Sequence, residues 1–347
     1  MESKGVLESL RGPVRIPSPL LGRVFFMVFQ KKPFKTIKEQ IELLESRGML
    51  IPDKVYASNY LLSNNYYNII NGYSKYFMSQ HDTYIPGTSF NEVTRLYQFD
   101  RDMKQAFFKS ILCIEGHLKS IFAYHFAEEY ASIPYAYLNT SCYDKEKVLS
   151  VVTTIYHLSG IINHYRKQTN NSITHYCKKY NSVPIWVLVN YLDFGELRHM
   201  ISASTTRLQN KIARDMESFI QQNIQKPGVF PPETMLSFIE NLNDLRNICA
   251  HNNRLIDYHC RRDSKYWEPL HDTYGLTANG YRNNVYSVML STQCFLSHIE
   301  YAFLHNSIRK LMNTHLKNHI KTIPYNTIIQ TLGYPDNWPE NESKISQ

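Results

Sequence analysis

The stretch LYQFDRDMKQAFFKSILCIEGHLKSIFAYHFAE, residues 96–128, decides the fold class of this chain. Its apolar residues recur at steps of three and four, which is the period of one face of an α-helix. Asn91 precedes the run and belongs to a residue type that caps helix N-termini. The pattern therefore predicts a long helix over about residues 92–130. The predicted buried stripe consists of Leu96, Phe99, Met103, Phe107, Ile111, Ile114, Leu118, Ile121 and Phe122.

The same period recurs along the chain, and no stretch alternates long enough to predict a sheet. Thr36, with Glu39 three residues later, predicts a capping box that opens a helix ending at Gly48. Further helices are predicted over about residues 145–168, from Pro184, and over about 207–224, 232–255 and 284–320. We therefore predict an all-α fold, with at most a short β-hairpin within a loop.

Residues 53–79 are rich in Tyr and Asn. Their aromatic rings suit either a protein core or stacking on nucleic-acid bases. The helical spacing of Tyr66, Tyr67 and Ile70 favours a place in the core.

The composition is that of a folded globular chain. Of 347 residues, 43% are hydrophobic and 20% charged, which argues against a largely disordered chain and against a membrane protein. Lys and Arg number 38 against 30 Asp and Glu, and the resulting net charge of +8 favours polyanionic partners. Six widely spaced cysteines, without a CxxC pair, indicate neither a zinc ribbon nor a disulfide framework, so the reducing cytoplasm is the simplest setting.

The first thirty residues differ from the rest. Residues 20–29, LLGRVFFMVF, are apolar but interrupted by Arg23, so the run is too short for a transmembrane helix. No cleavage site typical of a signal peptide follows it. We expect residues 1–30 to be a poorly ordered extension, with Met27 as an alternative start that would remove residues 1–26. The predicted regions after it are an N-terminal helical region over 31–90 and a helical domain over 91–340.

The segment FIENLNDLRNICAHNNRLI, residues 238–256, carries the candidate chemistry. As one helix, it would bury an apolar stripe and present a polar stripe on a neighbouring face. Asn247 and His251 would lie one turn apart and point the same way, and Arg246 and His251 would flank Asn247. The apolar stripe is Phe238, Leu242, Leu245, Cys249 and Ile256, and the polar stripe is Glu240, Asp244, Asn247, His251 and Arg254.

A guanidinium, an amide and an imidazole around one opening suit cleavage of RNA, which supplies its own 2′-OH nucleophile and needs no metal. His251 would transfer protons near neutral pH. Arg246 would bind phosphate oxygens and stabilise developing charge, and Asn247 would orient either partner. The products would be a 2′,3′-cyclic phosphate and a 5′-OH. The Arg-x4-His spacing alone is weak, because a helix-surface cluster would show it equally well.

The segment RNICAHNNRLID, residues 246–257, resembles the Arg-Asn-x3-His signature of HEPN-fold ribonucleases, and most closely its version in the Abi family (AbiD/AbiF-like) of abortive-infection proteins. Members often have Glu where this chain has Asn190, and Ser where it has Asp193. The resemblance covers about residues 31–340. It extends over PFKTIKEQIELLESRGMLI (33–51), the long helix at 96–128, PIWVLVNYLDFGEL (184–197) and LGYPDNW (332–338).

The resemblance implies a HEPN-like helical bundle with an N-terminal helical extension, acting as a homodimer that pools two copies of the motif. It also implies a toxin-like role in phage defence, in some members together with a small non-coding RNA that restrains or guides the protein. It further implies that Glu115, on the long helix, positions Arg246. The plainer interpretation of Glu115 and Lys119 is a surface i,i+4 pair.

Other charged residues have two interpretations each. Arg254 could hold RNA phosphate or a partner subunit. The family resemblance gives Asp100 and Arg101 a possible functional role, and their plainer interpretation is a solvated ion pair. His315 and His319 have metal-ligand spacing, but a solvated polar face suits them better. With these histidines, four cations make the C-terminal helix basic, either as a solvated face or as an RNA-backbone contact: Arg309, Lys310, Lys317 and Lys321.

The sequence therefore favours a metal-independent endoribonuclease of phage defence, with RNA as substrate, no cofactor and no membrane contact. The alternative is a non-catalytic protein that binds a structured non-coding RNA. A third possibility is a structural partner protein. No Gly-rich phosphate loop, GxSxG or HExxH segment is present, so ATPase, serine hydrolase and zincin functions have no support.

Overall fold

The computed structural model describes residues 33–80 and 82–346. The compact unit that contains the fold spans Ile37–Gln347. The predicted extension over residues 1–30, and with it the alternative start at Met27, lies outside the described residues. Within the described ranges, no helix combines the length and apolar character needed to cross a membrane.

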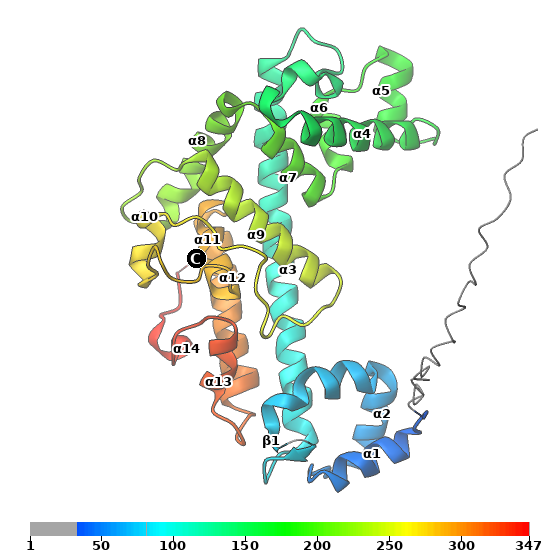
Figure 1. The fold of residues 1–347 in the computed structure, drawn as a ribbon, viewed down its shortest axis with the longest axis vertical. Coiled ribbons are helices and arrows are strands. Elements are labelled where there is room, and N and C mark those ends of the chain that lie inside the picture. Colours follow the sequence, from blue (N-terminus) through cyan, green and yellow to red (C-terminus); the bar gives the residue numbers. More distant parts are fainter. Residues whose placement is uncertain (1–32, 81, 347) are drawn as a thin grey trace, which may run out of the picture. The chain divides into compact units, whose positions relative to one another are not determined.

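Helices build the fold, which confirms the prediction of an all-α protein (Figure 1). The α-helices are α1 (Ile37–Ser46), α2 (Lys54–Asn64), α3 (Phe90–Glu129), α4 (Val148–Tyr165), α5 (Ser172–Tyr180), α6 (Ile185–Leu188), α7 (Phe194–Ala203), α8 (Thr206–Asn223), α9 (Pro232–Ala250), α10 (Glu268–His271), α11 (Val285–Ser291), α12 (His298–Leu311), α13 (Tyr325–Thr331) and α14 (Trp338–Asn341). π-Helical turns span Tyr67–Asn71 and Met312–Lys317. Short 3₁₀ turns span Ser74–Phe77, Ala136–Leu138, Thr140–Cys142, Lys145–Lys147, Val189–Tyr191, Asp272–Tyr274 and Thr292–Cys294.

Helix α3 is the central element, 40 residues long. Its predicted stripe is buried, except that Ile121 is only half-buried. The N-cap is Ser89, not Asn91 as predicted, because the Ser89 hydroxyl and the Glu92 carboxylate complete a capping box. Glu92 also accepts the backbone N–H groups of Lys321 and Thr322 at 2.7 and 2.8 Å, which ties the start of α3 to the C-terminal region.

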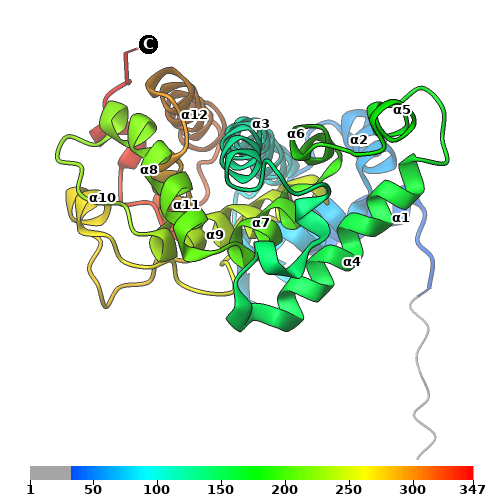
Figure 2. The same cartoon turned by 90° about the horizontal axis from the view of Figure 1, so that it is seen from above.

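Shorter helices surround α3, and its apolar stripe supplies the core that they share. Helices α6, α7, α8, α9 and α12 all pack on it. Viewed from above, α3 lies between α12 and α6, with α7 and α9 on a third side (Figure 2). A single cluster of buried apolar residues runs from Ile41 in α1 to Trp338 in α14. The division predicted near residue 90 stays a prediction.

The N-terminal region contains a short β-hairpin, which agrees with the prediction of at most one such hairpin within a loop. Strands β1 (Met78–Gln80) and β2 (Thr83–Tyr84) pair antiparallel, with Met78 opposite Tyr84. Ile70 is buried and Tyr66 packs on the core as predicted, but Tyr67 is 69% exposed. The prediction for Tyr67 was wrong because the chain there forms a π-helical turn, which rotates successive side chains differently from an α-helix.

Two predicted helices are shorter than their apolar patterns suggest. The helix predicted over 284–320 is interrupted, because Ser297 and Glu300 form a capping box that starts α12 anew. The helix predicted over 232–255 ends at Ala250. In both places, buried residues continue the apolar pattern through a turn, so the pattern alone could not show where the helix stops.

Candidate functional site

The candidate motif lies at the C-terminal end of α9. Pro232 occupies the first turn of this helix, where its missing N–H costs no hydrogen bond. Phe238, Leu242 and Leu245 are fully buried, as predicted, and hold the helix against α3 and α7. The motif therefore stands on a helix whose opposite face is locked into the core.

The helix ends within the motif. His251 is the C-cap residue, with φ −90° and ψ 8°, and its backbone N–H donates to the Asn247 carbonyl at 3.0 Å. The predicted polar stripe is accordingly wrong at two positions. Arg254 lies beyond the helix, and Asp244 is buried, where its carboxylate accepts the Arg261 backbone N–H at 3.2 Å.

Arg246, Asn247 and His251 lie in the last turn of α9 and at its C-cap. The Arg246 guanidinium donates from Nη1 to Oδ1 of Asn247 at 3.3 Å, so the amide orients the guanidinium. Both side chains are half-buried, whereas His251 is exposed. Within the described residues, Nε of Arg246 is buried without a hydrogen-bond partner. An unsatisfied buried N–H of this kind costs about 1–3 kcal/mol.

A buried ion pair on α3 fixes the chain that follows His251. The Asp100 carboxylate is fully buried and accepts the backbone N–H groups of Leu255 and Ile256, each at 2.9 Å. Lys104 pairs with Asp100 at 3.0 Å and donates to the side-chain oxygen of Asn252 at 2.7 Å. Asn252 has φ of 52°, a left-handed conformation that Asn tolerates and that turns the chain out of the helix.

Sequence reasoning missed this clamp. The interpretation of Asp100 and Arg101 as a solvated ion pair was wrong, because Arg101 pairs with Asp102 at 2.9 Å instead. A usable signal existed. Asp100 comes four residues after Leu96 and three before Met103, so it lies within the apolar stripe of α3, where a carboxylate must find buried partners.

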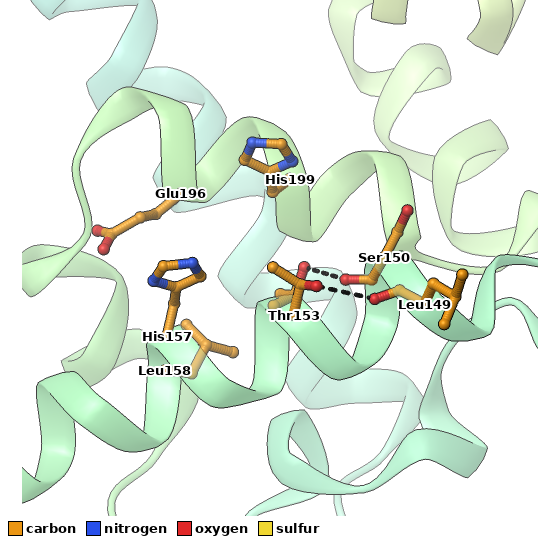
Figure 3. A pocket seen from close by; sticks show the side chains of 8 residues that line it. Leu149, Ser150, Thr153, His157, Leu158, Glu196 and His199 are labelled. Atoms are coloured by element: carbon orange, nitrogen blue, oxygen red, sulfur yellow. Dashed lines mark hydrogen bonds between the residues drawn. The ribbon is translucent and has the colours of Figure 1, made fainter. Parts of the chain in front are cut away.

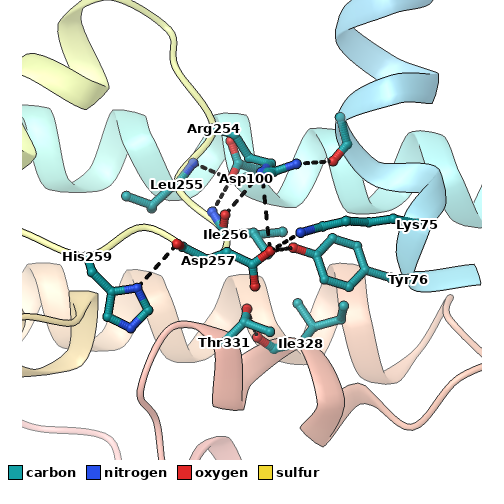
Figure 4. Close-up of polar contacts among 11 residues, drawn as sticks. Lys75, Tyr76, Asp100, Arg254, Leu255, Ile256, Asp257, His259, Ile328 and Thr331 are labelled. Atoms are coloured by element: carbon teal, nitrogen blue, oxygen red, sulfur yellow. Dashed lines mark hydrogen bonds and ion pairs between the residues drawn. The ribbon is translucent and has the colours of Figure 1, made fainter. Parts of the chain in front are cut away.

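Arg254 lies in a second polar cluster, between the loop after α9 and the N-terminal region (Figure 4). Its guanidinium donates to the carbonyls of Gly72 at 2.6 Å and Ile256 at 3.1 Å. Asp257 pairs with Lys75 and accepts the Tyr76 hydroxyl at 2.5 Å. Burial by itself raises the pKa of Asp257, but the bonds from Lys75 and Tyr76 outweigh it and lower that pKa. Arg254 is thus engaged in holding the loop to the turn after the π-helical segment.

Glu115 and Lys119 form a pair near the start of α7 rather than on the open surface. Their side chains are 2.7 Å apart and mostly buried, and Lys119 also donates to the Leu192 carbonyl at 2.7 Å. In the described part of the chain, no hydrogen bond or ion pair joins Glu115 to Arg246. Glu115 does keep one buried carboxylate oxygen, Oε2, without a hydrogen-bond partner among those residues.

The turn at Phe194 and Gly195, where α7 begins, adjoins α9. Asp193 is the N-cap of α7 and accepts the Glu196 backbone N–H at 2.8 Å, so it serves the capping role that Ser also serves. A Cβ atom on Gly195 would lie 3.6 Å from the side-chain oxygen of Asn243 in α9. Asn190 donates to the Trp186 carbonyl at 3.0 Å, a contact within its own turn.

A small pocket of about 260 Å³ lies between α4 and α7, apart from the motif (Figure 3). His157 from α4 and both Glu196 and His199 from α7 line it together with Leu149 and Leu158. Burial raises the pKa of Glu196. Burial, and then the neighbouring Arg198 and His157, lower the pKa of His199. Arg246, Asn247 and His251 do not line this pocket.

The basic C-terminal segment is partly engaged. Arg309 donates to the Glu342 carbonyl at 2.7 Å, and Lys317 pairs with Glu340. His315 is half-buried, 3.3 Å from Asp102, and burial lowers its pKa. Among residues 33–80 and 82–346, no three His, Cys, Asp or Glu side chains are grouped closely enough to hold a metal ion.

Comparison with models of known protein families assigns the chain to a family. A family model described as Abi-like protein matches residues 59–257, which is more than half of the chain and includes α3, α7 and the motif at the end of α9. The chain therefore belongs to the Abi-like protein family, and this membership implies a role in abortive-infection phage defence. No curated protein and no solved structure matches the chain.

Proposed function

We propose that this protein is a metal-independent endoribonuclease of the HEPN type, which cleaves RNA by attack of the 2′-OH at a site shared by two copies of the chain. Arg246, Asn247 and His251 are the proposed catalytic group. The proposed setting is the bacterial cytoplasm, where the enzyme acts as a toxin-like effector. A small non-coding RNA that restrains or guides it is part of the same proposal.

One observation carries the proposal. An exposed imidazole stands at the end of the helix that carries a half-buried guanidinium, and Asn247 orients that guanidinium. A partly exposed guanidinium suits a phosphate oxygen, because charge-assisted hydrogen bonds to phosphate are strong and directional. An exposed imidazole can act as a general acid or base toward a bound substrate.

The chemical step needs only these groups and the substrate. The 2′-oxygen forms a bond to phosphorus while its proton passes to an imidazole, and the bond from phosphorus to the 5′-oxygen breaks. The 5′-oxygen takes up a proton from an imidazolium. Arg246 stabilises the negative charge that builds up on the phosphoryl oxygens. One imidazole cannot act as base and acid at the same moment, so a second His251 from a partner copy supplies the other role.

The test uses purified full-length protein and RNA in the presence of EDTA. The expected products carry 2′,3′-cyclic phosphate and 5′-OH ends, and Arg246→Ala or His251→Ala abolishes their formation. His259→Ala is the matched control, because it removes another exposed imidazole from the loop after α9. Cleavage that survives both motif substitutions contradicts the proposal.

The second candidate is a non-catalytic protein that binds a structured non-coding RNA. It is favoured by the single imidazole that one chain presents at the motif, together with the net charge of +8. This candidate predicts tight binding that weakens with salt, without new RNA ends. The same incubation therefore separates the two functions.

A further inference from the structure

The segment that contains helices α4, α5 and α6 has no negatively charged side chain. Residues 147–192, here called the basic lobe, include five Lys or Arg residues and neither Asp nor Glu. They account for more than half of the chain's net charge of +8. Because α5 packs on both α4 and α6, the lobe is one continuous part of the fold.

Four of these cations are free for an external anion. Lys147 pairs with Asp144 at 3.3 Å and donates to the Ser202 carbonyl, so it has a structural role. The other four are exposed, and none forms an ion pair with any carboxylate in the described ranges. They lie at the C-terminal ends of two helices: Arg166 and Lys167 after α4, and Lys178 and Lys179 in the last turn of α5.

A hollow beside α5 shows where an anionic chain can lie. Lys178 lines it together with Asn170, Ser172 and His175, and its volume is about 500 Å³. Its other lining residues are also polar, which suits a sugar–phosphate backbone better than an apolar ligand. The acidic residues of α7, which packs on α4, are already engaged, since Asp193 and Glu196 accept each other's backbone N–H groups.

Exposed aromatic rings lie among these cations. Tyr180 is 53% exposed, and Lys179 is 5.2 Å from the centre of its ring. Trp186 is 56% exposed and, with Tyr124 of α3, lines a groove of about 700 Å³ that also contains Lys119 and Asn190. At the Tyr124 end, the groove includes Glu128, which Lys211 neutralises at 2.9 Å.

We infer that the basic lobe binds single-stranded RNA, with its four free cations on phosphates and with Tyr180 and Trp186 stacked on unpaired bases. Protein rings stack on bases that have left a helix, so the aromatic rings select a single strand over a duplex. This inference deepens the proposed function and rests on it for the identity of the polymer. It assigns RNA binding to a surface other than the C-terminal helix.

A second copy of the chain fits this surface less well. A symmetric dimer would place the lobe of one copy against the lobe of the other, so the two sets of cations would repel each other. Exposed Leu149 and Tyr156 on α4 nevertheless keep self-association as a measurable outcome.

The first experiment measures binding of a short, unstructured 2′-O-methyl RNA, which cannot be cleaved, by fluorescence anisotropy. Changing Arg166, Lys167, Lys178 and Lys179 together to Gln should weaken binding at least ten-fold. It should also flatten the salt dependence of log K by about 0.7 per lost phosphate contact. The control removes four other exposed cations: Lys38, Lys54, Lys226 and Lys265. Equal affinity in both variants overturns the inference.

The second experiment uses tryptophan fluorescence, because Trp186 is the one exposed tryptophan of three, while Trp267 and Trp338 are buried. Stacking should quench its emission as RNA is added. Trp186→Leu should lose about five-fold or more in affinity, whereas Trp186→Phe should keep affinity and lose the quenching. Emission that changes with protein concentration, and not with RNA, would assign the surface to a second copy and overturn the inference.

The outcomes separate this inference from the proposed function. If RNA binding depends on the basic lobe but no RNA is cleaved, the proposed nuclease function is refuted and the inference about the lobe is retained. If cleavage depends on His251 but the lobe variant binds RNA as well as the wild type, the inference about the lobe is refuted and the proposed nuclease function is retained. A DNA strand and an RNA duplex of the same sequence, used as competitors, show whether the lobe distinguishes single-stranded RNA from other nucleic acids.

Discussion

The buried carboxylate of Asp100 accepts the backbone N–H of Leu255 at 2.9 Å, across 155 positions in the sequence. This contact joins the central helix α3 to the loop that leaves the candidate catalytic motif. It belongs to a clamp in which Lys104 neutralises Asp100 and holds Asn252, the residue after His251. The position of the exposed imidazole therefore depends on a buried ion pair.

Removing one charge of that pair should destabilise the fold strongly. Asp100→Asn keeps the size of the side chain but leaves the Lys104 ammonium buried without a counter-charge, so we expect a loss of about 3–5 kcal/mol in the free energy of unfolding by urea. Asp102→Asn, at a partly exposed pair, should lose about 1 kcal/mol or less. Asp100→Asn with Lys104→Met should be more stable than Asp100→Asn alone. If the Asp100→Asn and Asp102→Asn variants are equally stable, the buried Asp100–Lys104 pair does not make the predicted contribution to the free energy of unfolding.

His251→Ala should reduce RNA cleavage by about 10²-fold or more, because a positioned general acid or base contributes roughly 10²- to 10⁴-fold. The free energy of unfolding should change by only about 0.5 kcal/mol, since the side chain is exposed. Arg246→Lys should also lose most activity, because an ammonium lacks the planar fork of the guanidinium. Product ends and urea unfolding, measured on the same preparations, provide both readouts. A His251→Ala protein that is inactive because it is unfolded would not support the proposed role.

Acid should weaken the fold through His271. Burial lowers the pKa of this histidine from 6.5 to about 4. Between these values the unfolded chain binds a proton that the folded chain does not, so stability falls as pH decreases from about 6.5 to about 4 and then levels off. The full effect is about 3 kcal/mol at 1.36 kcal/mol per pKa unit. In urea unfolding at pH 7 and pH 4.5, His271→Leu should lose less stability on acidification than the wild type. His259→Leu, at an exposed site, should keep the wild-type pH dependence.

Gly333→Ala should destabilise the C-terminal segment more than a comparable change elsewhere. Gly333 has φ of +85°, and a Cβ there would overlap the side-chain amide of Asn284, which is the N-cap of α11. Gly87 has a similar φ of +91° with nothing within 4 Å of its added Cβ. Gly87→Ala should lose about 1 kcal/mol from backbone strain alone, and Gly333→Ala roughly 2 kcal/mol more. Equal midpoints of thermal unfolding for the two variants would show that Asn284 moves aside freely.

Regular periodicity accounts for the parts of the fold that were predictable. The apolar stripe of α3 repeats over many turns, so errors at its ends did not affect its identification. The ends themselves were less predictable, as Ser89 and Asn91 are both good caps, and Glu92 decides between them by bonding to Ser89 and to the chain near Lys321. Tyr67 was misplaced because a single π-helical turn leaves no trace in the spacing of apolar residues.

The candidate motif could be recognised in the sequence, but its surroundings could not. Arg246, Asn247 and His251 are close in sequence, so the spacing that marks them as a motif does not depend on whether the helix ends at Ala250. The contacts of Asp100 and Lys104 instead depend on the meeting of distant segments. Arg254 illustrates the limit, since its partner carbonyl, that of Gly72, is 182 positions away.

Residue type and spacing were sufficient for the all-α class and for the order of the main helices, and they named the three residues of the motif as candidates. Each of these follows from interactions within about one helical turn, which a linear sequence displays directly. The end of α9 and the partners of Asp100 were decided only when the chain folded. The reason is that desolvation and ion pairing depend on which segments meet in space, and segments far apart in the sequence carry no local sign of that meeting.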